Sequence, residues 1–195
     1  MPRKTFDSLV SAGGLLLVAV LLVAGGLLTW GHDYIHHEVY TQLAAQKIVF
    51  PAANSPAVAA PEFAAMRQYG GQLLTTGAQA EVYADHFIAN HLKVIGGGKT
   101  YAQLSTESLA QPNNAKLTAQ VNEVFKGETL RGLLLNAYAF GTIGVIAGIA
   151  ALAAFVAAGL LLVLSALGLY HARRVSPGDQ ILAGSDPHQP VAAAD

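Results

Sequence analysis

The stretch SLVSAGGLLLVAVLLVAGGLLTWG, residues 8–31, contains no Asp, Glu, Lys, Arg or His, and neither does GLLLNAYAFGTIGVIAGIAALAAFVAAGLLLVLSALGLY, residues 132–170. The hydrocarbon core of a bilayer is about 30 Å thick, so a helix that crosses it needs roughly 20 apolar residues. Both stretches are long enough. Lipid offers backbone amides no partner outside their own segment, so each stretch is expected to be helical. The sequence therefore predicts an all-α membrane protein with two transmembrane helices.

The composition supports a membrane setting. Of the 195 residues, 53% are hydrophobic and only 12% are charged, whereas soluble domains are about one-quarter charged. The net charge is -1 and the basic residues are scattered, which argues against nucleic acid as a partner because that needs a clustered positive face. No cysteine is present, which excludes disulfides, thiolate nucleophiles and cysteine-ligated metal sites. The lipid bilayer is the partner that composition predicts.

A cleaved signal peptide is the alternative for residues 8–31. Arg3 and Lys4 precede the apolar run, and 23–25 offers a small-residue cleavage site. The run continues through Trp30, however, and a signal peptide has an apolar region of only about 7 to 15 residues. A mature N-terminus near Gly26 in N-terminal sequencing would establish the signal peptide.

The orientation follows from the charges that flank the two stretches. Arg3 and Lys4 lie before the first, and Arg173 and Arg174 lie after the second. Basic residues near span ends favour the cytoplasmic side, while long loops cross largely regardless of charge. The chain is expected in the plasma membrane, with both termini cytoplasmic and the central residues extracytoplasmic.

The second stretch is too long to be only a span. As one helix, its 39 residues would measure about 58 Å. The apolar helices are therefore expected to continue outside the lipid as helical stems, at 32–48 and 132–142. The predicted organisation is a cytoplasmic N-terminus (1–8), a transmembrane helix (9–30), an extracytoplasmic helical domain with its stems (31–142), a second transmembrane helix (143–169) and a disordered cytoplasmic tail (170–195).

Proline and glycine divide the central region. A Pro/Ala loop is expected at 51–61, then a helix over 62–95 that glycines 70, 71 and 77 can kink or divide. Gly96, Gly97 and Gly98 are expected to end that helix, and a short helix over 101–110 should begin from Thr100. The sequence GGGKT at 96–100 is not a phosphate-binding loop, because Lys93 stands where such a loop needs its first glycine.

Small residues in the two apolar stretches predict close helix packing, since they let backbones approach in lipid. Gly144 and Gly148 form a G-x-x-x-G, and Ala147, Ala151, Ala154 and Ala158 extend that face. The partner helix could be the other span, another copy or another subunit, and glycine is also simply common in spans. The candidate packing residues are Gly13, Gly14, Gly25, Gly26, Gly144 and Gly148.

Neither span contains an ionisable residue at depth. Such residues usually mark transport, proton relay or ion conduction. Their absence argues against a self-contained transporter and against a cytochrome with transmembrane histidine ligands.

Histidine concentrates in the central region. At 100° per residue, His32 lies in the apolar stripe of the first stem with His36 at its edge, and His91 lies in the stripe of the next helix, flanked by Glu81 and Asp85. If the stripes pack together, these five residues form a candidate metal site for zinc, copper or iron, or contribute to a haem site. The alternative is that each histidine is satisfied by a hydrogen bond.

The segments LVSAGGLLLVAVLLVAGGLLTWGH, TTGAQAEVYADHFIANHL, IGGGKTYAQ and GETLRGLLLNAYAFGTIG resemble a family of small two-span membrane proteins common in mycobacteria and related actinobacteria. The resemblance runs from about Phe6 to Arg174. Such proteins are often named aromatic ring-opening dioxygenase, but a ring-cleaving subunit is a soluble fold with an iron site. The resemblance implies the topology and an actinobacterial plasma membrane, and it brings no activity or site residues.

These observations favour a non-enzymatic accessory, scaffold or assembly subunit of a larger cell-envelope membrane complex. Its expected partners are other membrane protein subunits or further copies of itself, and it needs no cofactor. The alternative is an extracytoplasmic module that senses or binds a ligand, haem or a metal. An enzyme finds no support, because no nucleophile–base pair or carboxylate pair can be argued from spacing.

Overall fold

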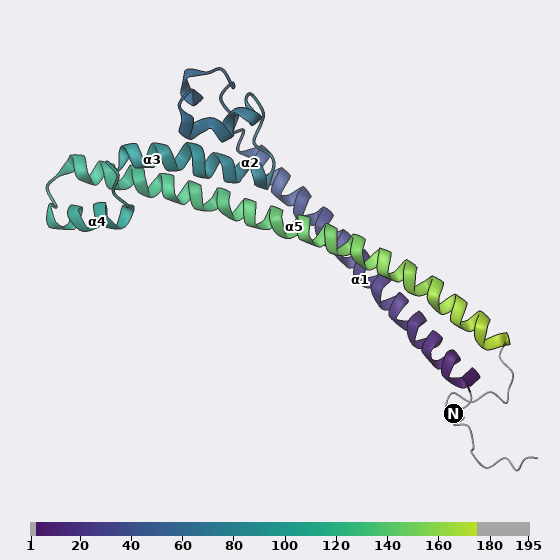
Figure 1. Cartoon of the computed structure of the whole chain (residues 1–195). Coiled ribbons are helices and arrows are strands. Elements are labelled where there is room, and N and C mark those ends of the chain that lie inside the picture. Colours follow the sequence, from purple (N-terminus) through teal and green to yellow (C-terminus); the bar gives the residue numbers. More distant parts are fainter. Residues whose placement is uncertain (1–2, 175–195) are drawn as a thin grey trace, which may run out of the picture. The chain divides into compact units, whose positions relative to one another are not determined.

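The computed structural model describes residues 3–174, and in that range the chain is helical apart from turns and one isolated antiparallel bridge between Val49 and Leu73 (Figure 1). The predicted all-α fold is confirmed for these residues, whereas most of the predicted tail, 175–195, lies outside them. The elements are α1 (Arg3–Ala45), the 3₁₀ helices η1 (Pro56–Val58) and η2 (Pro61–Tyr69), α2 (Gly77–Val82), the π-helical segment η3 (Tyr83–Ile88), α3 (Ala89–Ile95), α4 (Tyr101–Ala110) and α5 (Ala115–Arg174).

The chain divides into two compact units, and α1 and α5 contribute to both. The terminal unit comprises Met1–Thr29 and Ile149–Asp195, of which 3–29 and 149–174 are described. The central unit is Trp30–Gly148.

In the terminal unit, α1 and α5 lie side by side and antiparallel. A Cβ atom placed on Gly14 would overlap the Ser165 hydroxyl, and one placed on Gly25 would lie 2.9 Å from the Phe155 ring. The early turns of α1 thus face the late turns of α5. The small residues let the two backbones approach closely.

The buried positions of this pair recur every seven residues on both helices, as in a coiled coil. A repeat of about 3.5 residues per turn keeps one stripe of each helix facing its partner. The buried residues are Ser11, Val18 and Gly25 on α1 and Ala151, Ala158, Ser165 and Ala172 on α5.

Both α1 and α5 are long and apolar enough to cross a membrane. Large apolar side chains cover the faces turned away from the partner helix, among them Leu16, Val23 and Leu160. Exposed apolar faces of this extent are unusual for a soluble monomer and ordinary for a helix in lipid.

The core of the central unit lies where α2, η3 and α3, which follow one another without a break over 77–95, pack on the other elements. The backbone of Gly77 packs directly on the backbone of Gly141 in α5. A Cβ atom placed on Gly77 would lie 3.3 Å from the Gly141 Cα. Leu92 fills the space over Gly127, so this segment runs antiparallel to α5. The buried core residues are Val39, Leu43, Phe50, Val58, Met66, Leu74, Ala80, Ala84, Ile88, Leu92 and Leu134.

The helix predicted over 62–95 is two segments. A 3₁₀ helix covers Pro61–Tyr69, and α2 begins only at Gly77. Gly71 has a φ of 76°, and a Cβ on Gly70 would lie 2.6 Å from the Ala53 nitrogen. The glycine pair therefore makes a turn against the preceding loop, which a continuous helix could not do.

Other predicted boundaries are confirmed. The helix α3 ends at Ile95, where Gly97 and Gly98 adopt φ values of 60° and 79°. The helix α4 spans Tyr101–Ala110, and Thr100 and Gln103 form a reciprocal capping box at its start.

Candidate functional site

Two histidines of α1 lie on the glycine pair of α5 in the central unit. The His32 Nδ1 atom lies 2.8 Å from the Gly144 carbonyl oxygen. A carbonyl oxygen only accepts hydrogen bonds, so Nδ1 carries the proton and donates. The Nε2 atom of His32 is left as the ring nitrogen with a free lone pair in the neutral form.

The glycines leave the space that the imidazoles occupy. A Cβ on Gly148 would lie 2.8 Å from His32 Nδ1, and a Cβ on Gly144 would lie 3.4 Å from the His36 ring and 3.0 Å from Ile35. The sequence indicated this G-x-x-x-G as a place where helix backbones approach. In the structure its neighbours are side chains of α1, two of them ionisable.

The rings of His32 and His36 contact each other, with centroids 4.4 Å apart at an interplanar angle of 63°. Two imidazoles one helical turn apart can bind one ion or share a proton. Because His32 is held through Nδ1, its orientation is set by the backbone of α5.

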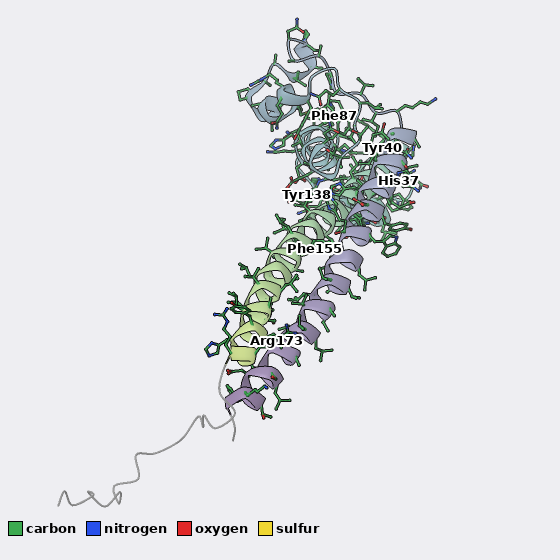
Figure 2. The ribbon with its side chains drawn as sticks, turned by 90° about the vertical axis from the view of Figure 1, so that its right-hand side faces the viewer. His37, Tyr40, Phe87, Tyr138, Phe155 and Arg173 are labelled. Carbon is green, nitrogen blue, oxygen red and sulfur yellow. The ribbon has the colours of Figure 1, made fainter. Side chains whose placement is uncertain are left out.

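His36 also lines a cavity of about 550 Å³ between α1, the start of α2 and α5. Figure 2 shows Tyr40 on α1 and Tyr138 on α5, both of which line this cavity. Its walls carry hydroxyl groups and the His36 imidazole, and no Asp, Glu, Lys or Arg lines it. The hydroxyl-bearing residues are Tyr40, Thr75, Thr76, Tyr138 and Thr142.

Local hydrogen bonds hold several of these hydroxyls in place. The Thr76 side chain caps α2 by accepting from the Gln79 amide at 3.2 Å, and the Thr142 hydroxyl donates to the Tyr138 carbonyl at 3.0 Å. The backbone contact of Gly77 with Gly141 brings α2 against α5 at this cavity. The cavity thus combines fixed hydroxyl groups with apolar walls that include Val39 and Val145.

The five candidate metal ligands are not brought together. Among the described residues, no group of three or more His, Asp or Glu side chains could hold a metal ion. Only His32 and His36 are in contact. The predicted apolar stripes of α1 and of the 77–95 segment do share one core, through Val39, Leu43, Ala84 and Ile88, but His91 lies outside that core.

His91 lies among aromatic side chains instead. Its ring is 4.3 Å from Phe87 and 5.9 Å from Phe63, centroid to centroid, and its Nδ1 donates to the Phe87 carbonyl at 2.7 Å. This is the hydrogen-bonded histidine that the alternative interpretation of the sequence described. It also lines a second cavity, of about 730 Å³.

The two candidate carboxylates have separate surroundings. Asp85 accepts a hydrogen bond from Arg131 at 2.7 Å, while Glu81 is half-buried on α2. The hydrogen bond to Asp85 raises the pKa of Arg131 above its ordinary value, against the opposing effect of partial burial. Arg131 therefore stays charged at all physiological pH, and Asp85 serves an ion pair across two elements.

The glycines proposed for helix packing fall into two groups. Gly14, Gly25, Gly144 and Gly148 lie against a neighbouring helix, whereas Gly13 and Gly26 have no other atoms within 4 Å of a Cβ position. The packing glycines Gly77, Gly127 and Gly141 were not foreseen. Two signals in the sequence could have indicated them. Glycines 127, 141 and 148 are spaced by fourteen and then seven residues, and Thr76-x-x-Gln79 is a helix-capping sequence directly around Gly77.

Comparison of the chain with protein-family models, curated proteins and solved structures finds no match. The assignment of function rests on the geometry described above.

Proposed function

We propose that the chain is a two-span membrane protein that serves as a non-enzymatic accessory, scaffold or assembly subunit of a larger cell-envelope complex. Residues 31–148 would lie on the extracytoplasmic side of the plasma membrane, with both termini cytoplasmic. Ser11 packs on Gly168 and Gly25 packs on Phe155. This register favours a second membrane segment at about 149–170, opposite 8–30, rather than at 143–169.

One observation carries the proposal, an apolar groove on the central unit. The groove has a volume of about 380 Å³ and lies between α1 and α5. Three of its residues are large and exposed, with Tyr34 at 55%, Phe140 at 58% and Ile143 at 53%. The residues that line it are Tyr34, Ile35, Glu38, Val39, Gln42, Ala137, Phe140 and Ile143.

The occupant that fits the groove is an apolar helix of another membrane subunit. Two long helices form its walls, and the Trp30 ring stacks on Tyr34 with the ring centroids 5.7 Å apart. Exposed aromatic side chains around a desolvated pocket are typical of binding hot spots.

Photo-crosslinking tests this proposal, with a matched pair of tyrosines. Tyr34 lies in the groove, whereas Tyr40, on the same helix and 56% exposed, lines the His36 cavity. Benzoylphenylalanine at position 34 should crosslink in cells to one specific integral membrane protein, which co-purifies with the wild-type chain in mild detergent. The same probe at position 40 should give much less of that product.

Equal crosslinking at the two positions would contradict the proposal, as would crosslinking to lipid alone. A product of twice the chain's own mass would make the groove a homodimer interface instead of a subunit-docking site.

A second candidate function is ligand or metal binding in the central unit, favoured by the contact between His32 and His36 beside a hydroxyl-lined cavity. Metal analysis and the absorption spectrum of the purified chain test it. Bound metal or haem should be lost in His32→Ala and His36→Ala and kept in His91→Ala. No metal, no haem absorption and no bound small molecule in the wild type would exclude it.

A further inference from the structure

A cleft with four polar residues in a largely apolar wall lies at one end of the helix pair of the terminal unit. It has a volume of about 490 Å³ and lies between the first turns of α1 and the last turns of α5. Apolar side chains make up most of its wall. The polar residues that line it are Asp7, Ser11, Ser165 and His171, and the large apolar ones are Phe6, Val10, Leu161, Leu164 and Leu167.

The two serines are held at the helix interface by opposite glycines. The Ser11 hydroxyl packs over Gly168, and the Ser165 hydroxyl packs over Gly14. Only 3% of Ser11 and 6% of Ser165 are exposed. Each glycine thus leaves room for the hydroxyl group of the other helix, and both hydroxyls lie beside the cleft.

Asp7 precedes Ser11 by one helical turn and carries a carboxylate oxygen that needs a partner. The Asp7 Oδ2 atom is shielded from solvent and has no hydrogen-bond partner among the side chains that the structure describes. A carboxylate oxygen buried without a donor is costly, and such atoms commonly mark an absent water, ion or ligand. A positively charged hydrogen-bond donor in the cleft would satisfy it.

We propose that the cleft binds the primary ammonium group of an aminophospholipid, the ethanolamine headgroup class. The ammonium donates to Asp7 Oδ2 and to the serine hydroxyls, while the acyl chains lie against Leu164, Leu167 and neighbouring side chains. The inference rests on the proposed membrane spans and is independent of the partner subunit.

Charge and the number of available oxygens both favour a lipid amine over a free metal ion. Lys4 and Arg174 lie one turn from Asp7 and His171 along their helices, and the Arg174 guanidinium is fixed over the Tyr170 ring at 4.5 Å. Lys4 and Arg174 do not line the cleft, but basic groups one turn away from it can pair with the phosphate of a headgroup whose ammonium lies on Asp7. One carboxylate with two hydroxyls provides fewer oxygens than calcium requires.

Lipid competition in nanodiscs tests the site with the full-length chain. Nanodiscs contain equal amounts of phosphatidylethanolamine and phosphatidylcholine, whose quaternary ammonium has the same charge and no N–H donor. Native mass spectrometry should find phosphatidylethanolamine retained in preference to phosphatidylcholine. Asp7→Asn should reduce that preference about tenfold, as expected for a lost charge-assisted hydrogen bond. Asp33→Asn, an exposed carboxylate elsewhere on α1, should not change it.

Equal retention of the two lipids by the wild-type chain overturns the proposal, and this result does not depend on any variant folding. Retention that is unchanged in Asp7→Asn also overturns it, as does a sodium adduct lost in Asp7→Asn without lipid preference. If lipid preference fails while Tyr34 crosslinks persist, the proposed function stands and only this site is wrong.

Discussion

At the residue scale, glycine in this chain mostly makes room for a particular neighbour. Gly148 leaves space for the His32 ring, Gly127 for Leu92, and Gly14 for the Ser165 hydroxyl. Each contact brings together side chains or backbones from elements far apart in the sequence. Substitution at these positions should therefore cost stability through crowding, whereas substitution at an uncrowded glycine of the same helix should not.

Gly148→Ala should destabilise the chain, because the new methyl group would lie 2.8 Å from His32 Nδ1 and displace the ring from its hydrogen bond to Gly144. The expected cost is about 1–3 kcal/mol, typical of overpacking. Gly132→Ala, with nothing within 4 Å, should be neutral or stabilise by up to about 1 kcal/mol through helix propensity. Thermal unfolding in detergent, followed by circular dichroism, measures both. Equal melting temperatures for the two variants would show that the His32 contact carries no energy.

The burial of Tyr83 leads us to expect that the stability of the chain changes with pH. Burial raises the pKa of Tyr83 above its ordinary value of 10.0, so the folded chain holds the phenolic proton more tightly than the unfolded chain. The stabilising contribution is complete below pH 10 and is lost as the pH rises beyond it. Above pH 10, the free energy of unfolding should fall less steeply with pH in Tyr83→Phe than in the wild type. Tyr40→Phe, at an exposed position, should behave like the wild type. Identical profiles of stability against pH for all three proteins would show that Tyr83 does not cause the loss of stability at high pH.

At the element scale, the helix pair of the terminal unit follows a seven-residue repeat of small residues. Ala151, Ala158 and Ser165 are buried, whereas Ala153 on the same helix is exposed. In lipid the helices gain little from burying apolar surface, so close packing of small residues supplies much of the association. A large residue on the packed face should separate the helices.

Ala158→Leu should lower the melting temperature in detergent by several degrees, because Ala158 is 2% exposed against α1 and extra methyl groups in a packed site cost about 1–3 kcal/mol. Ala153→Leu makes the same chemical change on the exposed face and should leave the melting temperature nearly unchanged. A similar effect of the two substitutions would argue against the seven-residue repeat.

Local features of the elements could be predicted from sequence, and so could some of the glycines at which the long helices meet, but the particular neighbours in most contacts between elements could not. Thr100 and the glycines at 96–98 carry their own backbone preferences, so the ends of α3 and α4 followed directly. The 77–95 segment packs on both long helices, because Ala84 and Ile88 share a core with Val39 of α1 and Gly77 lies on α5. Helical periodicity placed His91 in the apolar stripe of its helix, but its ring lies against Phe63 and Phe87, a contact that periodicity does not predict.

The candidate cavity shows the same division. His36 was identified from its helical phase, but Thr75, Tyr138 and Thr142 were not. They lie on two separate stretches of the chain, before α2 and on α5, which the Gly77–Gly141 contact brings together. The Asp7 cleft was missed because Asp7 lies just outside the charge-free stretch, where sequence alone gives no sign of burial.

At the scale of the whole molecule, the account depends on the chain crossing the membrane twice. Lipid then covers the apolar faces of the terminal unit, and a partner helix covers the apolar groove at Tyr34 and Phe140 in the central unit. If the chain did not cross the membrane, these faces would be exposed to water. The orientation determines where the partner of the groove must be sought.

Cysteine accessibility tests this claim most directly, because the chain contains no cysteine of its own. Gln103→Cys, on an exposed position of α4, should react with a membrane-impermeant maleimide in intact cells. Arg173→Cys, at the other end of the chain, should react only after the membrane is permeabilised. Labelling of position 173 in intact cells, or of position 103 only after permeabilisation, would contradict the proposed two-span topology.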